Sequence, residues 1–195
     1  MSGRTVFLRQ DLPPCHAAAL DYLRRELSPL ALCPPDHAGI GEWHTAECSN
    51  PGKRPWHKWQ HLQTQRPTEE MVNEWFRKVP GSNVGLALCD IIRIDVDGEG
   101  GEKLFMDLCG ELPVTVEFTT PSGGRGLLFR VPKGAKVKTT PKKAECINGH
   151  QELRFQARGA QTVVPPSRCA AGEWRWVPGR GMDDVEIAEL PPPSC

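Results

Sequence analysis

The sequence predicts a mixed α+β fold, and three observations lead to this prediction. Residues 16–27 and 67–78 have the composition and apolar spacing of amphipathic helices. Several short runs are rich in β-branched and aromatic side chains, as strands are. The chain also contains 19 glycines and 19 prolines, which favours turns, short elements and long connections over a helical bundle.

The composition limits the classes of function. The chain has 24 Lys or Arg and 24 Asp or Glu among 195 residues, so its formal net charge is zero. The strongly basic footprint of a tight non-specific DNA-binding domain is therefore missing, and any nucleic-acid contact must come from a local patch. No apolar run reaches the ~18 residues of a membrane-spanning helix, and the N-terminal residues do not resemble a signal peptide. We therefore expect a cytoplasmic protein without a membrane partner, with most of its eight cysteines reduced.

The first half of the chain predicts two helices and a β-hairpin. The first helix covers residues 16–27 and ends before Pro29. The second covers residues 67–78, with Thr68 as its N-cap and two glutamates in its first turn. Residues 84–88 form a strand that leads directly into the next strand, residues 91–97. Two strands with so short a connection predict a hairpin.

The strand of residues 91–97 ends in two carboxylates, Asp95 and Asp97. Side chains two positions apart on a strand point to the same face, so both carboxylates are expected to project together. One interpretation is a solvated strand end before a turn. The other is a site for a divalent cation, because hard oxygen ligands suit Mg²⁺ or Mn²⁺.

The second half predicts further strands and two loops of interest. A short helix is expected over residues 102–109, and strands over residues 114–120, 127–131, 151–155 and 157–167, with a final edge strand over 173–177. The loop of residues 121–126 is either a phosphate-binding loop or an ordinary hairpin turn. The lysine-rich stretch 133–143 is either a nucleic-acid contact or a solvated loop. Glu152 enters a strand among apolar neighbours and is a candidate third metal ligand.

Two cysteines flank two histidines in the connection after the first helix. Cys33, His37, His44 and Cys48 are separated by three, six and three residues. Thiolate and imidazole are the ligands that zinc prefers, and a loop without an apolar core often needs a metal. The usual Cys-x2-Cys pair is missing, however. A structural Zn²⁺ site and a set of unliganded loop residues both remain as interpretations.

Five landmarks follow one another in a recognisable order. They are Pro-Gly-Lys-Arg-Pro at 51–55 with Trp59-Gln60, Asn-Val-Gly-Leu at 83–86, Ile-Asp-Val-Asp at 94–97, Ser-Gly-Gly-Arg at 122–125, and Gln-Thr-Val-Val-Pro-Pro-Ser at 161–167. This order resembles the bifunctional primase-polymerase (Prim-Pol) domain of the archaeo-eukaryotic primase superfamily, found on plasmids, phages and other mobile elements. The resemblance covers about residues 17–177, within a single domain of residues 1–178. Residues 179–195 are expected to form an extended, loosely held proline-rich tail.

The resemblance implies a fold, a site and partners. The fold is an RRM-like catalytic sheet packed with an N-terminal α/β unit. The implied partners are a single-stranded DNA template, NTP or dNTP, and a separate or fused replicative helicase. The implied metals are Mg²⁺ or Mn²⁺, held by Asp95, Asp97 and Glu152. The implied nucleotide-binding residues are Ser122, Gly123, Gly124, Arg125, Lys53, Arg54 and Asn83.

Some positions depart from the family pattern. Gly126 stands where family members usually have a histidine that contacts the nucleotide, and Cys169 stands near a second expected histidine. Glu152 lies about two residues further from Pro165-Pro166-Ser167 than the family pattern implies. We predict a DNA primase/polymerase that uses two metals in phosphoryl transfer. The alternatives are a nucleotide- or DNA-binding module with weakened catalysis, and a metal-dependent nuclease.

Overall fold

The structure is a computed structural model that describes residues 11–140 and 153–191. Its helices are α1 (Pro14–Arg24), α2 (Glu42–Thr45), α3 (Glu69–Lys78) and α4 (Gly98–Cys109), with a 3₁₀ turn, η2 (Gln60–Gln63). The strands are β1 (Pro29–Leu32), β2 (Asn83–Ala87), β3 (Ile91–Val96), β4 (Glu117–Thr119), β5 (Arg125–Arg130), β6 (Leu153–Gln156), β7 (Gln161–Val163), β8 (Arg168–Cys169), β9 (Gly172–Glu173) and β10 (Arg175–Trp176). All the strand pairs in the named sheets are antiparallel, and the predicted α+β class is confirmed.

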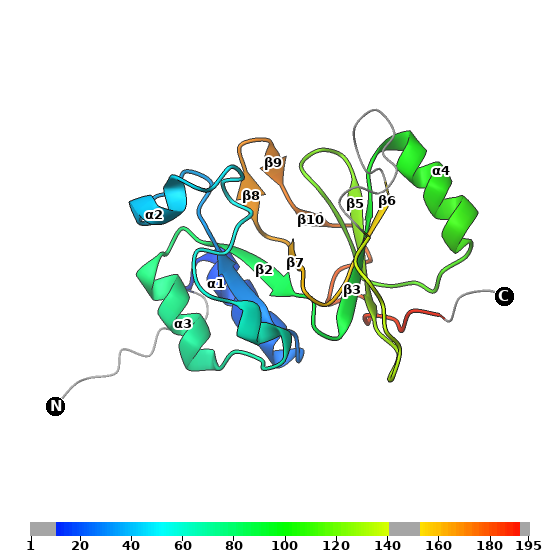
Figure 1. The fold of residues 1–195 in the computed structure, drawn as a ribbon, viewed down its shortest axis with the longest axis horizontal. Helices are drawn as coiled ribbons and strands as arrows, with labels where there is room; N and C mark the ends of the chain where they lie inside the picture. Colours follow the sequence, from blue (N-terminus) through cyan, green and yellow to red (C-terminus); the bar gives the residue numbers. More distant parts are fainter. Residues whose placement is uncertain (1–10, 141–152, 192–195) are drawn as a thin grey trace.

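The N-terminal unit is a three-stranded sheet, ordered β1-β2-β7, against which α1 and α3 pack (Figure 1). Helix α3 begins as its sequence predicts, because the Thr68 hydroxyl accepts a hydrogen bond of 3.3 Å from the Met71 amide. Its buried face consists of Val72, Trp75 and Phe76. Packing of this apolar face stabilises the helix more than its intrinsic propensity does.

The predicted hairpin between residues 84–88 and 91–97 is wrong. Strand β2 pairs with β1 and β7 in one sheet, whereas β3 pairs with β5 and β6 in another. The short connection at Cys89 and Asp90 therefore passes from one sheet to the other.

Strand β1, which was not expected from the sequence, is a fully buried four-residue run, Pro29–Leu32. Such a short apolar run has no periodicity to identify it, and its burial depends on tertiary packing.

The second sheet has five strands in the order β10-β4-β5-β3-β6, so β3 lies inside it. The side chains of β3 alternate between two cores. Ile92, Ile94 and Val96 pack with Phe105 of α4 in a smaller apolar cluster. Ile91 points to the other face and belongs to the larger cluster, which includes the N-terminal unit. The face that carries Arg93 and Asp95 is therefore the one turned toward the N-terminal unit.

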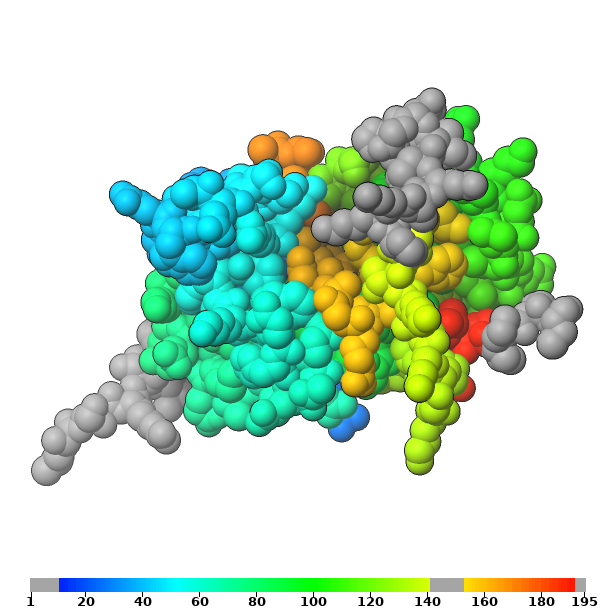
Figure 2. Space-filling view, viewed as in Figure 1, coloured from blue at the N-terminus to red at the C-terminus, as the bar shows by residue number. Residues whose placement is uncertain are grey.

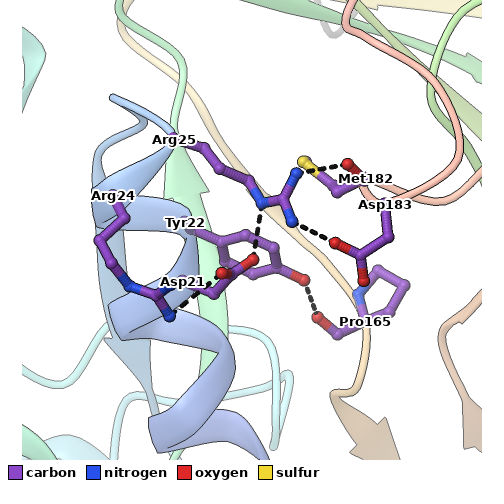
Figure 3. A network of polar contacts seen from close by, with 7 residues as sticks. All are labelled: Asp21, Tyr22, Arg24, Arg25, Pro165, Met182 and Asp183. Carbon is purple, nitrogen blue, oxygen red and sulfur yellow. Dashed lines mark hydrogen bonds and ion pairs between the residues drawn. The ribbon is translucent and has the colours of Figure 1, made fainter.

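Part of the C-terminal segment, between Met182 and Leu190, makes backbone and side-chain contacts with the rest of the domain. The backbone of Arg130 in β5 exchanges hydrogen bonds with Ala188 and Leu190, at 2.8 and 2.9 Å. Arg25 at the end of α1 donates to Asp21, to the Met182 carbonyl and to Asp183 (Figure 3). The sequence of this segment does not predict these contacts, because it is rich in proline and poor in large apolar residues. Its backbone partners are known only from the tertiary structure.

In the space-filling view, the cyan residues of the N-terminal unit lie on the left and the green residues of α4 on the right, with the gold-coloured segment around residues 155–165 between them (Figure 2). This segment includes β7, which belongs to the first sheet, and the end of β6, which belongs to the second.

Within the described ranges, no helix is both long and apolar enough to cross a membrane.

Candidate active site

Two carboxylates lie at the C-terminal end of β3. Asp95 is the fifth residue of the strand and is only 8% exposed. Asp97 follows the strand with an extended backbone (φ −121°, ψ 126°) and is the N-cap residue of α4. Because the two residues are two positions apart on extended backbone, their side chains share one face, as the sequence predicts. The apolar residues between and before them anchor that geometry in the core.

Two glycines of β5 and its preceding loop allow this close arrangement. Gly126 lies directly opposite Asp95, and a Cβ there would be 2.5 Å from Cζ of Phe118 and 2.8 Å from Nε of Arg93. A Cβ on Gly124 would be 2.0 Å from Oδ1 of Asp97. Real side chains do not tolerate such contacts, so both positions require glycine in this structure. The backbone of the Ser-Gly-Gly loop therefore lies against the second aspartate.

An arginine on the same strand neutralises Asp95. Arg93 is 8% exposed and forms an ion pair with the Asp95 carboxylate, and its Nη1 donates to Oγ1 of Thr162 at 3.2 Å. Its guanidinium also lies 5.3 Å from the centre of the Phe118 ring. Arg93 was not expected in the site, although its position two residues before Asp95 places it on the same face. That alternation was the signal that could have identified it.

Burial dominates the electrostatics of Asp95. Loss of hydration raises the pKa of the Asp95 carboxyl, and the charge of Arg93 opposes this change. Repulsion from Asp97 raises that pKa further, whereas the positive charges of Arg154 and Lys53 lower it. Arg154 lies opposite Asp95 on β6, so it shares the same face of the sheet. Basic groups from three separate segments therefore act on this one carboxylate.

The same face holds polar atoms without partners. Among the described residues, the Nε atoms of Arg93 and Arg154 and Oε1 of Gln156 are buried without a hydrogen bond. Gln156 lies opposite Arg93, and Arg154 lies opposite Asp95. Buried polar atoms of this kind are uncommon, and a ligand is one explanation for them. Two guanidinium N–H donors beside paired carboxylates suit a phosphate group that is bound together with a metal ion.

The paired aspartates also fit a hard divalent cation. Within the described part of the chain, the Asp97 carboxylate has no hydrogen-bond or ion-pair partner, and Arg93 contacts only Oδ1 of Asp95. Oxygen atoms on both side chains thus remain available for Mg²⁺ or Mn²⁺. The predicted third ligand, Glu152, lies outside the described residues.

The structure does not bring Arg125 to the aspartates. Arg125 lies opposite Val96, so its side chain is on the α4 face of the sheet. It donates two hydrogen bonds of 2.7 Å to Glu102 and one of 3.1 Å to Glu117, and it lies over the ring of Phe105 at 4.7 Å. The bonds to Glu102 raise the pKa of Arg125 and lower that of Glu102. Its charge is therefore already compensated.

The other predicted nucleotide-binding residues lie in two places. The Ser122 hydroxyl is exposed and lies 3.0 Å from Oγ1 of Thr120, and Gly123 has a left-handed backbone (φ +90°). Both belong to the loop beside Asp97. Arg54 is exposed and donates to the Glu47 carbonyl at 2.7 Å.

Asn83 acts as a structural connector. Its amide donates to the carbonyls of Gly52 and Arg168 at 2.8 and 2.6 Å, and its Oδ1 accepts from the Arg168 amide at 3.2 Å. These bonds use both ends of the buried side chain, so Asn83 holds the loop that carries Lys53. The Lys53 carbonyl accepts a further bond of 2.9 Å from Gln161, and its ammonium lies 5.5 Å from the Trp174 ring.

The predicted cysteine and histidine set converges. One ligand atom from each of Cys33, His37, His44 and Cys48 lies within 4.8 Å of all the others. This cluster belongs to the N-terminal unit and is separate in sequence from the aspartates. The lysine-rich stretch is described only to residue 140, and in that part Lys133, Lys136 and Lys138 are exposed.

Comparison with known proteins agrees with this geometry. No match is found among curated proteins. A family model described as bifunctional DNA primase/polymerase, N-terminal, matches residues 19–193, which is nearly the whole chain. The matched region contains the two sheets, the paired aspartates and the glycine-rich loop, so the chain belongs to the Prim-Pol family of DNA primases and polymerases.

Proposed function

We propose that this chain joins nucleotides on a single-stranded DNA template by two-metal phosphoryl transfer. The observation that carries the proposal is the face of β3. There, the carboxylates of Asp95 and Asp97 share one side with the Nε donors of Arg93 and Arg154, which have no hydrogen-bond partner within residues 11–140 and 153–191. Nucleotidyl transfer needs both elements, because the reacting group is a phosphate and its charge is held by metal ions and cationic side chains.

The carboxylates have the metal-binding role in this proposal. Asp95 and Asp97 would hold Mg²⁺ or Mn²⁺ together with Glu152, which directly precedes Leu153 in the chain. Leu153 pairs with Val96, the residue between the two aspartates. When bound, the metal ions lower the pKa of the attacking 3′-hydroxyl and neutralise charge on the leaving pyrophosphate.

The basic residues have the phosphate-binding role. Arg154 and Lys53 both act electrostatically on Asp95, so a triphosphate bound there would meet both positive charges. The loop of Ser122, Gly123 and Gly124 supplies backbone close to Asp97. Arg125 directly follows this loop, and its hydrogen bonds to Glu102 and Glu117 hold the end of the loop from the α4 face of the sheet. This assignment replaces Arg125 with Arg154 as the arginine that contacts the nucleotide.

The resemblance adds a biological setting to the proposal. By this resemblance, we propose that the protein serves the replication of a plasmid, phage or other mobile element. A helicase, separate or fused, would open the template for it. The exposed lysines after residue 132 are suitable for contacts with the template backbone.

A second function is favoured by one observation. The positive charge of Arg93 already balances the negative charge of Asp95, so this carboxylate depends less on a metal ion for its stability. A domain with this pair in place could bind nucleotide or DNA without chemistry. The two functions differ in one respect: only the polymerase must bind a catalytic divalent metal at Asp97.

The test is primer synthesis and primer extension on single-stranded DNA with labelled nucleotides and Mg²⁺ or Mn²⁺. Loss of metal ligation costs several kcal/mol in the transition state, so Asp97→Asn is expected to reduce extension by roughly 10²–10³-fold. Asp107→Asn is the matched control, because Asp107 is an exposed carboxylate on the outer part of α4. It should leave extension within about twofold of wild type.

The same experiment separates the alternatives. Nucleotide binding without product under either metal would overturn the polymerase and favour the binding module. In a parallel reaction with an end-labelled primer, shortening of the primer that depends on Asp97 would instead indicate a nuclease. Equal losses in Asp97→Asn and Asp107→Asn would show that the effect does not arise from metal binding at β3.

A further inference from the structure

We propose that Cys33, His37, His44 and Cys48 bind a structural Zn²⁺ ion that fixes the Gly52–Arg54 loop. This site is distinct from the carboxylates of β3 in position and in ligand chemistry. Two thiolates and two imidazoles form the donor set of many structural zinc sites, whereas Mg²⁺ prefers oxygen. Four protein ligands also leave no position open for water, so the site is structural rather than catalytic.

The distances within the cluster fit a tetrahedral ion. Zn–S and Zn–N bonds of about 2.3 and 2.0 Å give ligand–ligand separations of roughly 3.3–3.8 Å. The two sulfur atoms lie 3.9 Å apart, and all four ligand atoms lie within 4.8 Å of one another. Movements of about 1 Å or less would complete the site. A disulfide is not present, because its sulfur atoms would be about 2.05 Å apart.

One ring nitrogen of each histidine has no hydrogen-bond partner among the described residues. Within the described residues, Nε2 of His37 and Nε2 of His44 are buried and make no hydrogen bond. His44 is only 3% exposed, and the two rings lie edge to face with their centres 5.4 Å apart. Buried ring nitrogens without partners are costly, and a metal ion would satisfy them. This observation is independent of the ligand spacing in the sequence.

The surrounding segment contains little other structure. Within residues 33–59, all of which the structure describes, the four-residue α2 is the only helix, and an isolated bridge joins Pro55 to Leu32. Cys33 directly follows β1 and Cys48 follows α2, and both side chains are buried. A metal that joins these ends would hold α2 and its flanking loops against the core. Segments without an apolar core often depend on such a link.

The cluster is connected by hydrogen bonds to the loop that carries Lys53. The Cys33 amide donates to the Arg54 carbonyl at 2.8 Å, and Arg54 donates to the carbonyl of Glu47, next to Cys48, at 2.7 Å. Asn83 holds the Gly52 carbonyl from the other side at 2.8 Å. The ion would therefore fix one end of this loop. An effect of this ion on nucleotide binding rests on the proposed function. The existence of the zinc site does not rest on it.

The first test measures zinc in the purified full-length chain by mass spectrometry of the metal content. One equivalent of zinc per chain is expected in wild type and less than about 0.2 equivalents in Cys48→Ser. Cys109→Ser is the matched control, since Cys109 is a partly buried free thiol in α4 outside the cluster. It should retain the full equivalent. A zinc-free wild-type chain, or zinc retained in Cys48→Ser, would overturn the proposal.

A second measurement does not depend on the folding of a variant. Wild-type protein reconstituted with Co²⁺ should show the intense visible absorption of tetrahedral cobalt and a sulfur-to-cobalt charge-transfer band. A weak octahedral spectrum without the charge-transfer band would contradict the site.

Limited trypsin digestion tests the link to the loop. Lys53 is exposed, and the Lys53–Arg54 bond should be cleaved at least about tenfold faster after a zinc-selective chelator is added. Cleavage at Lys133, in another exposed loop, is the internal control and should not change. Equal protection of Lys53–Arg54 with and without zinc would show that the ion does not fix this loop. None of these measurements requires polymerase activity, so failure of the zinc site and failure of the proposed function are distinguishable.

Discussion

Arg93 and Asp95 form a buried ion pair within a single strand, at the position where the family's metal-binding carboxylate is expected. Both side chains are about nine-tenths buried, so neither charge can rely on water. The pair is stabilised further by the Arg93 bond to Thr162 and by the ring of Phe118. Arg93 therefore stabilises the ionised form of Asp95 and opposes the effect of burial on the pKa of this carboxyl.

Removal of Arg93 should destabilise the fold strongly. Arg93→Met leaves Asp95 buried and unpaired, and breaking such a pair costs roughly 3–5 kcal/mol in the free energy of unfolding. The double variant Arg93→Met/Asp95→Leu removes both charges and should recover most of this loss. Urea denaturation of the three proteins measures the effect. A double variant as unstable as the single one would mean that packing, not charge, explains the loss.

A side chain at Gly126 should be poorly tolerated. Because a Cβ there would approach Phe118 and Arg93 to less than 3 Å, Gly126→Ala is expected to lower the free energy of unfolding by roughly 1–3 kcal/mol. Gly126→His, which introduces the side chain that the family resemblance implies, should be at least as costly. Gly81→Ala is the control, since a Cβ there would meet Pro34 at an ordinary 3.6 Å. Thermal unfolding of these variants tests the prediction, and equal shifts at both glycines would contradict it.

Buried histidines should make the fold sensitive to acid. Burial lowers the pKa of His16, its bond to Asn73 partly offsets this, and the charge of Arg77 lowers it further. Since the folded-state pKa lies below the unfolded value of about 6.5, protons bind preferentially to the unfolded chain. Stability should thus be complete above about pH 6.5 and decline as the pH falls toward the folded-state pKa.

Denaturant unfolding between pH 7.5 and pH 5.5 measures this decline. His16→Gln should reduce the pH dependence, because Gln does not titrate there. His61→Gln is the comparison, since His61 is exposed on η2, and it should change the dependence less than His16→Gln does, because it acts only through its repulsion on the buried His57. His57 is expected to act in the same direction as His16, because burial also lowers its pKa. An unchanged slope in His16→Gln would assign the acid sensitivity to other groups.

The hydroxyl of Tyr22 should connect α1 to the Pro-Pro-Ser segment. Tyr22 is the single tyrosine of the chain, is 3% exposed, and donates to the Pro165 carbonyl (Figure 3). Tyr22→Phe leaves that carbonyl without its donor and should cost roughly 1–3 kcal/mol. Thr64→Val removes an exposed hydroxyl that donates to the His61 carbonyl, and should cost less than about 0.5 kcal/mol. Chemical denaturation compares the two, and equal costs would count against the role of burial.

Much of the local structure could be predicted from the sequence. The two long helical patterns, the Thr68 cap and the aspartate strand have local causes: apolar spacing, a hydroxyl that satisfies a free amide, and β-branched side chains. The shared face of Asp95 and Asp97 follows from extended backbone alone. Residue type and spacing also marked Cys33, His37, His44 and Cys48 as candidate metal ligands, and the structure brings these four residues together.

Other features depend on which strands become neighbours. The order of strands in the sequence is compatible with a hairpin at Cys89-Asp90 and with a crossover between two sheets. In the structure, β2 pairs with the buried strand β1 instead of β3, so the connection crosses between the sheets.

The position of each arginine is decided in the same way. Pairing of β6 with β3 places Arg154 opposite Asp95, and pairing of β5 with β3 turns Arg125 toward α4. Register determines the face of every side chain, and register is a property of the assembled sheet. The sequence by itself thus determined the chemistry of the carboxylates, and only the tertiary structure decided which cations surround them.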